Sequence, residues 1–172
     1  MKVFFSGLLL LLVMYGLQTS LLTFLDYNGV SVNLMLLVTV SVAFLHGWKA
    51  GVAAGLLTGL LQDFSSGSFF GCATFSYMTI GLFFGRFSKH VFKEQMFFPV
   101  LSAPMAAAIH FCIMSAFLFM LGMKPDLIQS VRTILIPFVL YQLVFSWFVH
   151  KVVKSFGNFA AEQMQIKTGG LK

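Results

Sequence analysis

The chain has 172 residues and a formal net charge of +6; 59% of the residues are hydrophobic and only 9% are charged. An average soluble domain is about 45–50% apolar and about 25% charged, so this composition excludes a soluble globular protein. It also excludes a disordered chain, which needs low hydrophobicity. We therefore expect an all-α, polytopic membrane protein in contact with the lipid bilayer. Nucleic acid is not an expected partner, because the basic residues form no stripe with exposed aromatic residues.

The first predicted transmembrane helix is Val3–Leu25, which follows Lys2. The run is too long for the apolar region of a secretory signal peptide, so we expect it to stay in the protein. The next apolar stretch, Val32–Leu61, would be about 45 Å long as one helix, against a bilayer core of about 30 Å. It would also place Lys49 near the bilayer centre, at a cost of about 2.5–3.5 kcal/mol. We therefore predict two helices that meet at His46–Lys49.

Three further apolar runs predict the remaining spans at Phe69–Gly85, Phe97–Leu121 and Val131–Val149. This gives a transmembrane domain of six helices over residues 1–150. Residues 151–172 form a short basic tail whose apolar positions recur at helical spacing. Two interpretations of the tail remain open: it continues the last helix into the headgroup region, or it docks a cytoplasmic partner.

The basic residues predict the orientation of the six spans. Nine of the eleven Lys and Arg residues fall on one side, and only Lys124 and Arg132 fall on the other. By the positive-inside rule the first side is cytoplasmic, so both termini are expected in the cytoplasm. A five-span arrangement with the N-terminus outside gives seven against three, so the charge bias alone leaves it open. The cost of burying Lys49 favours six spans.

The strongest pattern in the chain is a set of glycines four residues apart on two neighbouring predicted helices. The third helix carries Gly47, Gly51, Gly55 and Gly59, and the fourth carries Gly81 and Gly85. Residues at this spacing lie on one face of a helix, and a face without side chains lets another backbone approach closely. Two interpretations remain open: packing within this chain, or a face for another membrane protein.

The segment after the third predicted helix contains a set of polar residues and glycines, namely Asp63, Ser66, Gly67 and Gly71. Asp63 is an ionisable group at the outward membrane edge, where such groups can contact substrates or relay protons. The same segment is typical of a turn followed by a helix N-cap, because Asp and Ser side chains accept hydrogen bonds from free amides. We expect an outer loop that caps the fourth helix, with a functional role for Asp63 as the alternative.

His110 and Gln142 are predicted near the middle of the fifth and sixth helices. We expect a buried polar pair between them, since interhelical hydrogen bonds in membranes contribute roughly 0.6 kcal/mol. The alternative, a proton relay, needs a chain of titratable groups, and no acidic residue is predicted at comparable depth. The sequence also has no nucleophile–base motif, embedded carboxylate pair or phosphate-binding loop. We therefore expect no catalytic residue, no cofactor and no metal site.

Residues 30–90 carry a combination of short motifs. They are Asn33–Leu37, His46–Gly51, Gly55–Asp63, Ser66–Gly71, Tyr77, Gly81 and Gly85–Arg86. This combination resembles the MreD family of bacterial rod shape-determining proteins, and the length and the number of spans fit that family over the whole chain. After residue 95 only the hydropathy agrees.

The resemblance implies a non-enzymatic subunit of the cell-elongation machinery in the bacterial cytoplasmic membrane. Such a protein pairs with the bitopic protein MreC and so connects MreB filaments with the glycosyltransferase and transpeptidase of peptidoglycan synthesis. The family is also similar in fold to the substrate-binding subunits of energy-coupling-factor transporters, which would put Asp63–Gly71 at the mouth of any pocket. That similarity supplies an alternative function, a vitamin-binding transporter subunit. The alternative is weakened because the first helix has no Ala-xxx-Ala pair for docking on a transporter.

Overall fold

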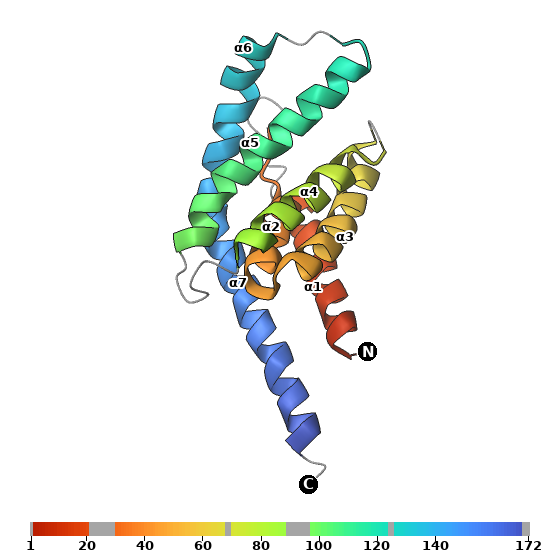
Figure 1. The fold of residues 1–172 in the computed structure, drawn as a ribbon, viewed down its shortest axis with the longest axis vertical. Coiled ribbons are helices and arrows are strands. Elements are labelled where there is room, and N and C mark those ends of the chain that lie inside the picture. The colour runs from red at the N-terminus through yellow and green to blue at the C-terminus, as the bar shows by residue number, and fades with distance from the viewer. Residues whose placement is uncertain (1, 21–29, 68–69, 89–96, 124–125, 170–172) are drawn as a thin grey trace.

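The computed structural model describes residues 2–20, 30–67, 70–88, 97–123 and 126–169, and these residues are helical apart from short connections. The helices are α1 (Lys2–Ser20), α2 (Leu34–His46), α3 (Trp48–Ser66), α4 (Cys72–Phe87), α5 (Phe97–Met120), α6 (Leu127–Ser130) and α7 (Ile136–Gly169) (Figure 1). A π-helical segment, η2 (Val131–Leu135), joins α6 to α7. The predicted all-α class is confirmed for this part of the chain.

The predicted break between the second and third helices is confirmed. Gly47 lies between α2 and α3 with a φ of 84°, a left-handed value that glycine adopts without a steric penalty. Its N–H donates to the carbonyl of Ala43 at 3.0 Å, and its carbonyl accepts from the N–H of Gly51 at 2.9 Å. One residue therefore ends α2 and begins α3, and it leaves Trp48 and Lys49 exposed in the first turn of α3.

The boundaries of the later helices differ from the predictions at two places. α4 begins at Cys72 rather than Phe69, because Gly71 has a φ of 98° and precedes the first helical residue. The last helical run extends from Leu127, through η2, to Gly169, so it starts earlier and ends later than Val131–Val149. It passes position 150 without a break. The tail is helical as far as Gly169, which agrees with a continuation of the last helix, and docking of a cytoplasmic partner stays the alternative.

α2 is the central helix of the bundle. It contacts α1, α3, α4, α5 and α7, and nine of its 13 residues are buried. α3 and α4 pack against each other as a hairpin, and α5 packs along α7 to form a second pair. The end of α5 and the start of the α6–α7 run extend beyond the other helices at one end of the molecule (Figure 1). The last turns of α7 project from the opposite end, where α1 begins.

Two described segments, Val100–Met120 and Ile128–Gly157, have the length and hydropathy of membrane-crossing helices. Large apolar side chains are exposed on both, for example Leu101 and Val144, as on a surface that contacts lipid or another protein. α2 has 13 residues and is shorter than the roughly 20 residues of a typical span. The two long helices agree with a membrane protein, and the arrangement with six spans stays a prediction.

Candidate functional site

The glycines of α3 and α4 bring the two helix backbones into direct contact. A Cβ atom added to Gly51 would lie 2.6 Å from the carbonyl oxygen of Gly81, and one added to Gly55 would lie 2.5 Å from that of Tyr77. Three further glycines would meet the facing backbone in the same way, namely Gly59, Gly81 and Gly85. Real Cβ atoms do not approach other atoms this closely, so a side chain at any of these positions would push the helices apart.

Of the two interpretations of the glycine pattern, the structure has packing within the chain. Gly51, Gly55 and Gly59 are buried under α4, so this face is not available to another protein. Gly47 has a different role, because a Cβ atom there would meet nothing within 4 Å. Its positive φ makes the turn between α2 and α3 and does not make a close contact.

Asp63 caps the N-terminus of α4 from the last part of α3. The side chain is only 4% exposed. One carboxylate oxygen accepts from the N–H of Ala73 at 2.9 Å. The other accepts from the N–H groups of Gly71 and Thr74, both at 3.0 Å, and from the hydroxyl of Thr74 at 2.5 Å. These bonds satisfy amides that a helix start leaves without partners, and they agree with the predicted cap.

The other predicted residues of this segment shape the turn. Gly67 ends α3 with a φ of 61°, and its N–H donates to the carbonyl of Asp63 at 3.3 Å. Gly71 has a φ of 98° and directly precedes α4. Both left-handed positions favour glycine. Ser66 is the exposed last residue of α3.

Asn33 joins three helices at the centre of the bundle. Its side-chain oxygen accepts from the N–H of Leu36 at 3.0 Å and thereby caps α2. Its side-chain amide donates to the hydroxyl of Tyr77 on α4, and its backbone carbonyl accepts from the side-chain amide of Gln142 on α7 at 3.3 Å. Tyr77 and Gln142 are both fully buried. One capping residue thus links α2, α4 and α7.

The predicted direct pair between His110 and Gln142 is wrong in its partners. The Nδ1 atom of His110 lies 2.8 Å from the hydroxyl of Ser76, and its ring centroid is 5.3 Å from that of Tyr77. Gln142 bonds to Asn33 instead, and its side-chain oxygen is buried with no hydrogen-bond partner among the described residues. His110 and Gln142 therefore both belong to one polar cluster, which also contains Asn33, Ser76 and Tyr77. Within this cluster His110 contacts α4 and Gln142 contacts the start of α2, and the two residues do not bond to each other.

A cavity of about 260 Å³ adjoins this cluster. Its polar lining residues are Gln18, Ser31, Asn33, Gln62 and His110. The side-chain amide of Gln18 donates to Gln62 at 2.8 Å, which joins α1 to α3. Within the described residues, no three His, Cys, Asp or Glu side chains gather as a metal site would require.

The comparison with known families bears on this geometry. Residues 1–159 match the family described as rod shape-determining protein MreD. The chain belongs to the MreD family. No curated protein and no solved structure matches the chain. MreD proteins determine rod shape at the bacterial membrane and are not known as enzymes.

The motifs that carry the resemblance to MreD fall on the hairpin of α3 and α4 and on the start of α2. Gly55 and Gly81 lie in the backbone contact, and Asp63 closes the hairpin at the end where α3 stops and α4 begins. Asn33 and Tyr77 donate and accept the hydrogen bond that fixes α2 to this hairpin. The MreD motif in this chain is therefore an arrangement for packing helices.

Three residues of the polar cluster and of the cavity beside it are not predicted from the sequence as site residues: Gln18, Gln62 and Ser76. Asn33 and Tyr77 were noted only for the resemblance. The signal for Asn33 was available, because an Asn directly before an apolar helix is a preferred N-cap. The side-chain partners of Gln18 and Ser76 lie 44 and 34 residues away, and Gln18 also accepts from the N–H of Met35, 17 residues away, so local sequence gives no signal for these bonds.

Proposed function

We propose that the chain is a non-enzymatic scaffold of the bacterial cell-elongation complex, and that it pairs in the cytoplasmic membrane with an MreC-like bitopic protein. The observation that carries this proposal is the match of residues 1–159 to the MreD family. The interior supports it, because the glycine contacts, the Asp63 cap and the Asn33 bonds all hold helices together. Through its partner the protein would connect indirectly with MreB filaments and with the glycosyltransferase and transpeptidase of peptidoglycan synthesis.

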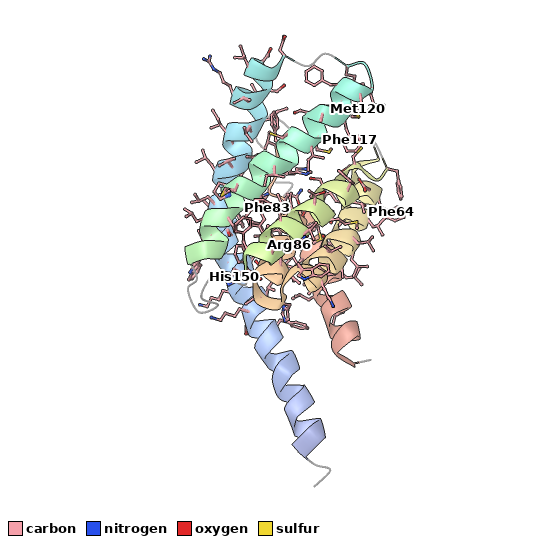
Figure 2. The ribbon with its side chains drawn as sticks, in the orientation of Figure 1. Phe64, Phe83, Arg86, Phe117, Met120 and His150 are labelled. Atoms are coloured by element: carbon pink, nitrogen blue, oxygen red, sulfur yellow. The ribbon has the colours of Figure 1, made fainter. Side chains whose placement is uncertain are left out.

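The proposed topology has six spans with both termini in the cytoplasm. α1 begins and α7 ends toward the same end of the molecule (Figure 1). Arg86 and His150 lie far from Met120, which is near the opposite end (Figure 2). Reporter fusions after residues 28, 92 and 172 test the arrangement: position 28 should report as external and the other two as cytoplasmic. A cytoplasmic position 28 would support five spans and contradict the proposal.

The test of function is depletion of the protein in its rod-shaped host. Cells should become round or swollen, and a wild-type copy should restore the rod. A Gly55→Leu variant should fail to restore shape, because its side chain would meet the backbone of α4. Gly16→Leu is the matched control, since a Cβ atom at Gly16 meets nothing within 4 Å. Cells that keep their shape on depletion would refute the proposed function.

Purification in mild detergent tests the pairing. A bitopic membrane protein should co-purify in a constant ratio with the wild-type chain and with the Gly16→Leu variant. A stoichiometric vitamin without a protein partner would instead support the transporter alternative. That alternative is not favoured, because the family that matches residues 1–159 is a shape-determining one.

A further inference from the structure

A second, larger groove opens between α1, α2, α3 and α7. Its volume is about 360 Å³, and it is separate from the cavity beside Asn33. Small residues of three helices line it, Gly7, Ala53 and Gly157, together with larger apolar residues such as Leu10 and Phe156. Among the described lining residues His46 is the one polar side chain. A groove of this lining suits a hydrocarbon, which needs no hydrogen bonds.

α1 and α3 both contribute lining residues to the groove, and a hydrogen bond between the two helices lies outside it. The hydrogen bond between Gln18 and Gln62 joins the outer ends of the two helices. Toward the beginning of α1, a Cβ atom at Gly7 would meet nothing within 4 Å. The lining residues Gly7, His46 and Ala50 place the groove toward the end of the bundle where α1 begins, α2 ends and α3 starts. In the proposed topology this is the cytoplasmic end.

Two basic residues lie one helical turn from lining residues at this end of the groove. Lys49 is exposed on α3 one turn before Ala53, and Lys154 is half-buried on α7 one turn before Gly157. α7 passes close to the end of α2 here, since a Cβ atom at Gly157 would lie 3.6 Å from the His46 ring. The ammonium group of Lys49 also lies 5.7 Å from the centre of the Trp48 ring. A Trp and Lys pair of this kind is typical of a membrane interface.

Negative charge is scarce at the same end. The carboxylates among the described side chains are Asp63 and Asp126, and both lie at the outer end in the proposed topology. In the sequence, the predicted cytoplasmic side holds nine basic residues against two acidic ones, Glu94 and Glu162. An apolar groove with a basic rim complements a ligand that has a hydrocarbon chain and an anionic head.

We propose that this groove binds an anionic phospholipid of the cytoplasmic leaflet, with one acyl chain between α1 and α3 and the phosphate between Lys49 and Lys154. A transmembrane helix of a partner is a poorer occupant, because a helix with its side chains is about 10–12 Å wide. A zwitterionic lipid would fill the apolar part but would leave the basic rim without its counter-charge. The proposal rests on the proposed topology for the choice of leaflet and for the charge balance at this end.

The test is native mass spectrometry of the purified full-length chain. The protein is equilibrated with equal amounts of phosphatidylglycerol and phosphatidylcholine and then delipidated in steps. The wild type should retain phosphatidylglycerol longer. The double variant Lys49→Gln/Lys154→Gln should lower that preference by about fivefold for each charge removed. Ala53→Phe should lower the retention of both lipids, because Ala53 is exposed in the groove and its new ring would occupy the space of the acyl chain.

Matched controls separate the site from general charge and size effects. Arg132→Gln removes an exposed charge at the other end of the chain, and Leu56→Phe enlarges an exposed residue of α3 that does not line the groove. Both should retain lipid as the wild type does. Equal retention of the two lipids by the wild type would overturn the proposal. So would a double variant that loses no more preference than Arg132→Gln. Such failures leave the scaffold role untouched, since that is measured by cell shape and co-purification.

Discussion

Replacing Asp63 tests whether the turn between α3 and α4 holds the fold together. The side chain is buried and accepts four hydrogen bonds, three of them from backbone N–H groups at the start of α4. Two variants divide these bonds. Asp63→Ala removes all four, whereas Asp63→Asn can keep its oxygen where three donors converge and turns its amide toward the N–H of Ala73.

The hydrogen bonds that each variant loses predict a different loss of folding free energy. Asp63→Asn loses one bond to a charged acceptor and places a donor opposite a donor, which should cost about 2 kcal/mol. Asp63→Ala loses the cap and leaves amides of the first turn without acceptors, which should cost about 4 kcal/mol. For a chain of this size, 1 kcal/mol corresponds to roughly 2–4 °C in Tm. We therefore expect Tm to fall by about 4–8 °C for Asp63→Asn and by about 8–16 °C for Asp63→Ala.

The assay is thermal unfolding of the purified protein in detergent, followed by tryptophan fluorescence. Asp126→Asn is the control, because Asp126 is exposed and its substitution should change stability by less than about 0.5 kcal/mol. The order of Tm should be wild type and Asp126→Asn, then Asp63→Asn, then Asp63→Ala. If Asp63→Ala melts together with the control, the cap does not stabilise the hairpin and the reasoning fails.

Three further substitutions probe the packing by the same melting assay. Gly55→Ala should lower stability by about 1–3 kcal/mol, because its Cβ atom would lie 2.5 Å from the carbonyl oxygen of Tyr77. Gly16→Ala, in open space, should not destabilise the protein, and equal melting temperatures of the two variants would contradict the close contact. Tyr77→Phe should cost about 1–3 kcal/mol, since it leaves the buried amide of Asn33 without its acceptor; an unchanged Tm would mean that the bond does not contribute. Gln142→Leu should be nearly neutral or stabilising, because its side-chain oxygen has no partner among the described residues and its nitrogen makes a long bond of 3.3 Å. A loss above about 2 kcal/mol would contradict this reasoning.

The sequence was informative where one residue type has a single physical consequence. The excess length of a single helix and the cost of Lys49 near the bilayer centre predicted a break at His46–Lys49, and the structure has it at Gly47 with a φ of 84°. Glycines at a spacing of four predicted a bare helix face, and α3 buries that face against α4. The sequence did not identify α4 as the occupant of that face, because a bare face accepts any backbone of suitable shape.

The wrong pairing of His110 with Gln142 has a geometric cause. Hydropathy fixes how deep a residue lies along a helix, and the two residues are at similar predicted depth. It does not fix how each helix is rotated about its own axis. His110 instead faces Ser76 on α4, and Gln142 faces Asn33 on α2. Contacts of this kind depend on the whole arrangement of helices around α2.

The length of the last helix was underestimated for a related reason. The apolar run ends near Val149, where Lys151 follows, and a hydropathy argument ends the span there. Backbone hydrogen bonds continue a helix regardless of polarity when no breaker follows, and α7 continues to Gly169. The end of a membrane span and the end of a helix are two different positions in the chain, and hydropathy predicts only the first.

The burial of the glycine face restricts where a membrane partner can bind. α4 covers that face of α3, and exposed apolar side chains such as Leu101, Met105, Val144 and Trp147 lie instead on α5 and α7. A variant of Gly55 should therefore lose its partner only together with thermal stability, since it acts through the fold. A variant of Trp147 at a partner contact should lose the partner at an unchanged Tm, because its side chain is 52% exposed. Measuring co-purification and melting on the same samples distinguishes a contact surface from the packing that supports it.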